Sequence, residues 1–93
     1  MRTELALPAR LDLPAAKPLA EAIIALRGQD LRLSAEEVSY LGTPGVQVLL
    51  SAARSWRADG KKLSLDSGSE AFSEQLSILG INPGALVAPG PEV

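Results

Sequence analysis

In Tyr40-Leu41-Gly42-Thr43-Pro44-Gly45-Val46-Gln47-Val48-Leu49-Leu50, a threonine, a proline and a glycine separate an apolar strand-like run from an apolar helical run. This order predicts that Thr43 caps a helix, with its hydroxyl accepting a hydrogen bond from a free backbone N–H. Pro44 fits the first helical position, which needs no N–H donor. Because the exposed N–H groups and the helix dipole favour negative charge there, the same hydroxyl could carry a phosphate. Thr43 therefore has two interpretations, a plain helix cap or a regulatory phosphoacceptor.

Strand-like and helical patterns alternate on both sides of this segment. Alternating apolar residues predict strands at 3–7, 31–33 and 62–65, and a strand or an extended turn at 11–13. Apolar residues at three- and four-residue spacing predict helices at 18–27, 43–59 and 72–79. Strands that alternate with helices in this way form βαβ units, in which neighbouring strands are parallel and the helices pack against the sheet.

Glycines and turn residues mark where these elements end. Three glycines follow helical patterns and are expected to end them: Gly28, Gly60 and Gly80. Ser67-Gly68-Ser69 is expected to be a turn that carries the cap of the third helix. A second turn at 82–84 is expected to lead into a last short strand at 85–88.

Length and composition define a small domain with an aliphatic core. The 93 residues fit one domain, which we expect at 1–88, followed by a disordered tail at 89–93. Hydrophobic residues make up 46% of the chain, which is typical of a globular protein, but only three residues are aromatic. We expect Trp56 to be a half-buried cover of the core, and Tyr40 to pack against the sheet with its hydroxyl at the edge.

The charges and the missing residue types narrow the function classes. Nine basic and 11 acidic residues give a net charge of −2, which argues against a nucleic-acid partner. The chain has no Cys and no His, so the commonest metal ligands and the commonest general base are absent. The pair Glu36-Glu37 offers too few oxygens for a divalent metal, and we expect neither a metal nor a cofactor. Without a secretory signal or an apolar run of roughly 20 residues, we expect a cytoplasmic protein that does not insert into membranes.

Several segments, taken together, resemble the STAS domain of bacterial anti-sigma factor antagonists. They are Leu11-Asp12, Leu31-Arg32-Leu33-Ser34, Val38 to Val46, Ala53-Arg54-Ser55-Trp56, Gly60-Lys61-Lys62-Leu63 and Leu79-Gly80-Ile81. The resemblance covers roughly residues 3 to 81. It implies an α/β fold with a small mixed sheet, parallel βαβ units and three to four helices packed mainly on one face.

The resemblance also implies a regulatory site. In the similar antagonists, the hydroxyl at the Thr43 position is phosphorylated by a partner kinase that is also the anti-sigma factor, and phosphorylation breaks the complex. The partner surface that this implies here consists of Asp12, Ser34, Ser39, Gly42, Thr43, Pro44 and Gly45. Two positions depart from the family pattern, because Gly42 and Ser34 replace residues that are usually acidic or amide, which makes the surroundings of Thr43 less acidic. Gly45 is expected to permit a close approach of backbone.

Other functions remain open at this stage. A threonine at this position also resembles the STAS subunits of lipid-exporting ABC transporters, which dock on the ATPase without a phosphorylation cycle. An adaptor role in a chemotaxis-type signalling complex is a further alternative. An enzyme with Thr43 as nucleophile would lack a His to activate it, so we expect a binding protein and not an enzyme.

Overall fold

A computed structural model describes residues 3–65 and 69–90. Its elements, in chain order, are β1 (Thr3–Ala6), β2 (Arg10–Leu11), α1 (Leu13–Ile24), β3 (Leu31–Ser34), β4 (Tyr40–Leu41), α2 (Thr43–Asp59), β5 (Lys62–Leu65), α3 (Glu70–Ile78), a 3-10 helix (Pro83–Leu86) and β6 (Ala88–Pro89). The predicted alternation of strands and helices is confirmed.

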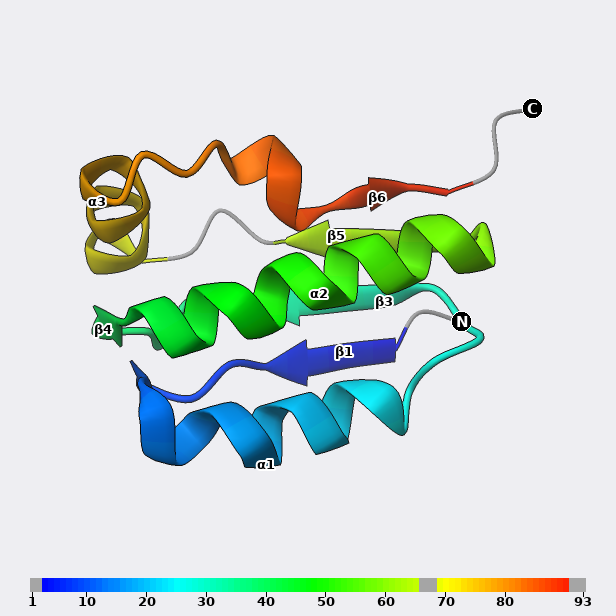
Figure 1. The fold of residues 1–93 in the computed structure, drawn as a ribbon, viewed down its shortest axis with the longest axis horizontal. Coiled ribbons are helices and arrows are strands. Elements are labelled where there is room, and N and C mark those ends of the chain that lie inside the picture. Colours follow the sequence, from blue (N-terminus) through cyan, green and yellow to red (C-terminus); the bar gives the residue numbers. More distant parts are fainter. Residues whose placement is uncertain (1–2, 66–68, 91–93) are drawn as a thin grey trace.

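The main sheet is mixed and has the strand order β1-β3-β5-β6. Strand β3 pairs in parallel with both β1 and β5, and β6 pairs antiparallel with β5. A helix connects the two strands of each parallel pair: α1 lies between β1 and β3, and α2 lies between β3 and β5. The predicted βαβ units are therefore present. Helix α2 crosses in front of the sheet, and α1 runs beside it (Figure 1).

A second ladder consists of two strands, β2 and β4, and extends the β1–β3 pair toward the starts of α1 and α2. Arg10 and Leu11 of β2 pair in parallel with Tyr40 and Leu41 of β4. Between the two ladders, the Leu7 N–H donates to the Ser34 carbonyl at 2.8 Å. The small ladder therefore fixes where α1 and α2 begin, since each helix follows one of its strands.

The core is aliphatic, as predicted, but its largest member is an aromatic residue. Trp56 on α2 is 0% exposed, and its indole Nε1–H donates to the Gln29 carbonyl at 2.8 Å. The expectation of a half-buried cover is wrong because Trp56 extends the buried stripe of α2 that Leu49 and Ala53 begin, one helical turn further on. Gly60 ends this helix in the left-handed conformation, as predicted, with a φ of 67°.

Helix α1 begins five residues earlier than predicted, at Leu13. Pro14 lies in its first turn, where a missing N–H costs nothing, and Pro18 lies inside the helix on its exposed side. The lost hydrogen bond at Pro18 is offset by the burial of Leu19 and Ile23 against the core. Gly28, at a φ of 89°, follows the turn after this helix instead of ending it directly.

The C-terminal segment differs from the prediction in two places. Of the predicted strand at 85–88, Ala85 and Leu86 belong instead to a 3-10 helix, while Ala88 lies in β6. The Asn82 side chain caps the 3-10 helix by accepting from the Gly84 N–H at 2.9 Å. Strand β6 then includes Pro89, so the predicted tail begins inside a strand. A proline suits this edge strand because it has no N–H to leave unpaired. Residues 91–93 of the predicted tail, and 67–68 of the predicted turn, lie outside the described residues.

Candidate functional site

Helix α2 starts with Gly42, not Thr43, as its N-cap residue. The Gly42 N–H donates to the Leu11 carbonyl at 2.8 Å, and the Gly42 carbonyl accepts from Val46 N–H at 3.1 Å. This tether to β2 advances the helix start by one residue and makes Thr43 the first helical residue. The predicted cap at Thr43 is therefore wrong, and Pro44 occupies the second helical position. The Thr43 side chain is exposed to solvent and makes no capping hydrogen bond.

Gly45 lies where α2 crosses closest to β2. A Cβ atom on Gly45 would lie 2.6 Å from the Leu11 carbonyl oxygen and 2.8 Å from Leu11 Cβ. Both distances are shorter than real Cβ contacts. Gly45 is buried, and its role is to let the first turn of α2 rest on Leu11.

The residues of the predicted partner surface divide by exposure. Thr43 and Ser39 are exposed, while Asp12, Gly42 and Pro44 are half-buried. Ser34 is 8% exposed and lies in the central strand β3, so it does not present a surface to a partner. Exposed Leu13 joins the group because it starts α1 directly after Asp12. We call Asp12, Leu13, Ser39, Gly42, Thr43 and Pro44 the Thr43 surface.

Helix α3 holds the segment that leads into α2. The Gln75 side chain accepts a hydrogen bond from the Leu41 N–H at 2.6 Å and donates one to the Ser39 carbonyl at 3.3 Å. The Ser69 hydroxyl caps α3 by accepting from the Phe72 N–H at 3.1 Å, as predicted, and also donates to the Val38 carbonyl. Gln75 thus occupies the free edge of β4 as a neighbouring strand would, and fixes the approach to Thr43.

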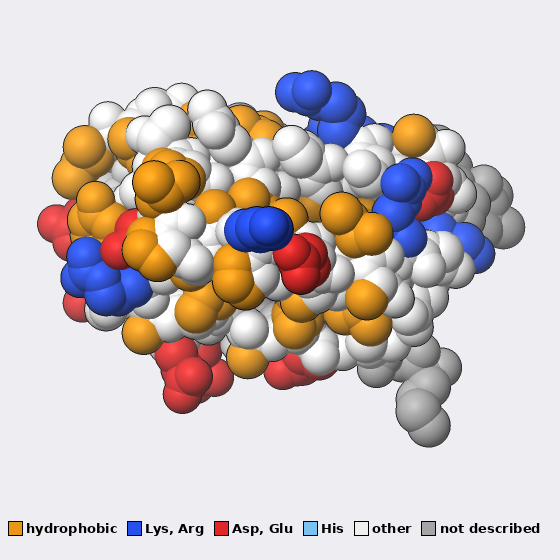
Figure 2. Space-filling view, turned by 60° about the horizontal axis from the view of Figure 1, so that its bottom comes forward, with side chains coloured by type: hydrophobic (Ala, Val, Ile, Leu, Met, Phe, Trp, Pro, Cys, Tyr) orange, Lys and Arg blue, Asp and Glu red, His pale blue; other side chains and the backbone are white. Residues whose placement is uncertain are grey.

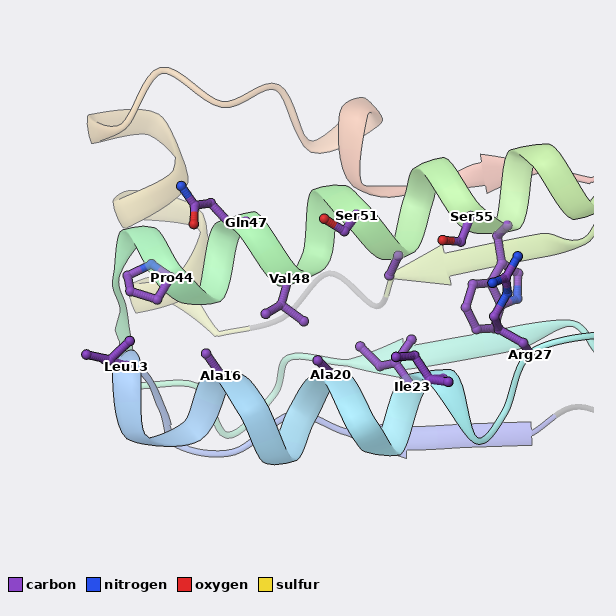
Figure 3. Close-up of a pocket in the computed structure, with 13 residues that line it drawn as sticks. Leu13, Ala16, Ala20, Ile23, Arg27, Pro44, Gln47, Val48, Ser51 and Ser55 are labelled. Carbon is purple, nitrogen blue, oxygen red and sulfur yellow. The ribbon is translucent and has the colours of Figure 1, made fainter.

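An apolar groove runs between α1 and α2 and opens beside the Thr43 surface (Figure 3). Its volume is about 430 Å³. Leu13 and Pro44 face each other at one end, while alanines of α1 and the serines of α2 line its walls. Leu13 is 74% exposed, and hydrophobic side chains gather over the face that α1 occupies (Figure 2). The sequence pattern predicts a strand or an extended turn at 11–13, whereas Leu13 is the first residue of α1, so the pattern did not predict this groove.

The far end of the groove carries an ion pair. The Arg27 guanidinium donates to both carboxylate oxygens of Asp59, from Nη2 at 2.9 Å and from Nε at 3.1 Å. This hydrogen bonding, more than the charge attraction, lowers the pKa of Asp59 and raises the pKa of Arg27. The pair joins the end of the α1 segment to the end of α2, since Arg27 and Asp59 are 32 residues apart.

The Arg27–Asp59 pair predicts how the stability of the fold depends on pH. Because the folded state lowers the pKa of Asp59, its stabilising contribution is present above the ordinary aspartate pKa near 4 and is lost as the pH falls through the lowered value. We expect the unfolding free energy of wild type to fall more steeply than that of Asp59→Asn between about pH 5 and pH 2. Urea titrations of both proteins across this range measure the difference. Parallel curves would show that the pair contributes nothing to folding.

The site offers binding groups more than catalytic ones. Within residues 3–65 and 69–90, no group of three or more carboxylates is placed to hold a metal ion. None of the helices in that part of the chain is long and apolar enough to cross a membrane. What this part of the surface offers is an exposed hydroxyl, an apolar groove and an ion pair.

Such a small α/β fold with a hydroxyl at the start of α2 defines a class of interaction domain. Residues 2–88 match the family described as Mlab, STAS domain, so the chain belongs to the STAS domain family. STAS domains are in general interaction modules without catalytic activity. No curated protein and no solved structure matches the chain significantly.

Proposed function

We propose that this chain is a regulatory module that binds a protein partner through the Thr43 surface. The partner class that we favour is a bacterial kinase of the anti-sigma type, and Thr43 would be the point of control. The observation that carries this proposal is the exposed Thr43 hydroxyl at the first position of α2, beside exposed Leu13. An accessible hydroxyl next to an exposed apolar side chain combines a site for modification with an anchor for binding.

The electrostatics of this helix start suit a phosphate. The first turn of α2 holds no acidic residue, and its free N–H groups and dipole favour negative charge. A phosphate on Thr43 would therefore be tolerated by the domain itself. Its charge and bulk would act mainly on the partner, by placing close to two negative charges inside the contact.

A substitution that imitates this charge tests the control point. We expect Thr43→Glu to weaken partner binding by about tenfold or more, because the carboxylate would be desolvated or repelled at the interface. Thr43→Val keeps the shape and is expected to stay within about threefold of wild type. Isothermal titration calorimetry with the purified partner measures both. If Thr43→Glu binds as tightly as wild type, Thr43 does not control the complex.

One series of experiments identifies the partner and tests the Thr43 surface. The tagged protein is used to capture partners from its native extract, and each specific partner is then purified and titrated. Leu13→Asp is expected to weaken binding by about tenfold or more, because it places a charge in the apolar part of the surface. Ile78→Asp is the matched control. The Ile78 side chain lies on α3 and is 77% exposed, which is similar to the 74% of Leu13. Equal affinities for the two variants would overturn the proposed surface.

One observation favours a second candidate, the ATPase subunit of an ABC transporter. Leu13, Pro44 and the apolar groove offer the kind of surface that lasting complexes bury, which is more apolar than that of transient ones. In that case Thr43 is a contact residue only. Incubation of the captured partner with ATP and this protein separates the two, because only a kinase adds phosphate to Thr43, which intact-mass spectrometry detects.

A further inference from the structure

Arg10 lies beside the Thr43 surface and stacks on an aromatic ring. It pairs with Tyr40 in the small ladder, and its guanidinium carbon lies 4.7 Å from the centroid of the Tyr40 ring. Its Nε–H donates to Asp12 Oδ2 at 3.1 Å. Tyr40 does not pack against the sheet as the sequence predicted, because its ring forms this outer platform instead.

Two contacts thus engage the Arg10 guanidinium. Its carbon lies over the Tyr40 ring, and its Nε–H donates to Asp12. No residue of the described chain accepts a hydrogen bond from its two terminal amino groups, and the side chain is 66% exposed. A guanidinium whose two terminal amino groups are free can bind a carboxylate through two parallel hydrogen bonds. The contacts with Tyr40 and Asp12 restrict the side chain, which lowers the entropy cost of binding.

Gly42 makes room for the Tyr40 platform. A Cβ atom on Gly42 would lie 3.3 Å from Tyr40 Cε2 and 3.5 Å from the Tyr40 hydroxyl, so the ring would have to shift by a few tenths of an ångström to admit a side chain there. Asp12, the N-cap residue of α1, is the acidic group nearest to Arg10, and it is already bound to the Arg10 Nε–H. Beyond it, neither α1 nor α2 has an acidic residue in its first turn, and both helices begin beside Arg10, where the positive ends of their dipoles favour an anion.

We propose that Arg10, held on Tyr40, binds an aspartate or glutamate side chain of the protein that docks on the Thr43 surface. The inference rests on the proposed function and specifies the chemistry of the partner, which must present a carboxylate opposite Arg10. The contact would work as an anchor, because tyrosine and arginine supply much of the energy of many interfaces. Within this contact Asp12 is a positioning residue, since it bonds to the Arg10 Nε–H and leaves the terminal amino groups to the partner carboxylate.

The first test uses the isolated domain and a defined probe. N-acetyl-aspartate methylamide is titrated into the ¹⁵N-labelled protein, with N-acetyl-asparagine methylamide as the neutral control. We expect the Arg10 Nε–H resonance to shift saturably with the aspartate compound only, and the shift to disappear in Tyr40→Ala. Arg54, exposed on α2 and without an aromatic platform, is the internal control. Equal shifts at Arg10 and Arg54 would overturn the inference.

The second test uses the partner captured on the Thr43 surface. Arg10→Gln is expected to weaken binding by about tenfold to 100-fold and Arg10→Lys by nearly as much, because lysine keeps the charge but loses the planar pair of donors. Arg54→Gln is expected to bind as wild type does. If Leu13→Asp weakens binding but Arg10→Gln does not, the docking surface stands and the carboxylate contact is refuted. If neither variant weakens binding, the proposed function fails, and the titration of the isolated domain decides the contact.

Discussion

Gly45→Ala is expected to lower the free energy of unfolding by about 2 kcal/mol or more, although alanine is the better helix former by about 1 kcal/mol. The added methyl group would lie 2.6 Å from the Leu11 carbonyl oxygen, which is a backbone atom and not the flexible end of a side chain. That carbonyl also accepts the hydrogen bond from the Gly42 N–H. The strain can be relieved only if the first turn of α2 moves away from β2.

Urea denaturation, followed by the circular dichroism of the helices, measures this loss. Gly42→Ala is the matched control, because Gly42 is three residues away and its nearest obstacle is the movable Tyr40 ring at 3.3 Å. We expect the control to lose about 0.5–1 kcal/mol as the helix cap changes. Should Gly45→Ala prove as stable as Gly42→Ala, the close packing of α2 on Leu11 would be wrong.

The same substitution links the fold to the docking surface. The contact at Gly45 sets how far Thr43 lies from Leu13, because Thr43 precedes Gly45 by two residues and Leu13 follows Leu11 by two. A shift of the α2 start would therefore separate the two parts of the Thr43 surface. A Gly45→Ala variant that still folds should bind the partner more weakly, since docking requires both parts in one geometry.

Local sequence patterns predicted the order of the helices and strands but not the exact residues at which they begin. The apolar spacing that ends in Trp56 and the glycine at 60 predicted α2 and its end, because both depend on neighbours within a few residues. The start of α2 was displaced by one residue, from Thr43 to Gly42 as the cap. That choice depends on the hydrogen bond to the Leu11 carbonyl, which lies 31 positions earlier in the chain and leaves no local pattern.

In the candidate site, too, local features were predicted and contacts between distant residues were not. The close approach of backbone at Gly45 was predicted, because a glycine just after a helix start often marks a place where a side chain would not fit. The pairing of Arg10 with Tyr40 was not, since it requires the parallel register of β2 with β4. Leu13 was misplaced for a related reason. Alternation with Leu11 predicted a strand or an extended turn at 11–13, whereas β2 ends at Leu11, Asp12 caps α1, and Leu13 lies exposed in the first turn of that helix.

Trp56→Ala is expected to cost about 3–5 kcal/mol, enough to bring a domain of this size close to unfolding. Trp56 is 0% exposed and is one of the residues around the α1–α2 groove. Its removal would join the vacated volume to that groove, so the loss comes from both burial and cavity. The Gln29 carbonyl would also lose the indole N–H that it accepts at 2.8 Å, and with it the attachment of the loop that follows α1.

Thermal unfolding followed by circular dichroism measures this effect, since the substitution removes the only tryptophan. Trp56→Phe keeps an aromatic ring but loses the N–H donor and part of the buried ring volume, and it is expected to cost about 1–2 kcal/mol, less than the alanine variant. An alanine variant no less stable than the phenylalanine variant would show that the indole ring does not hold α2 in place. The effect also bears on function, because Trp56 is one of the residues around the groove that opens beside Leu13.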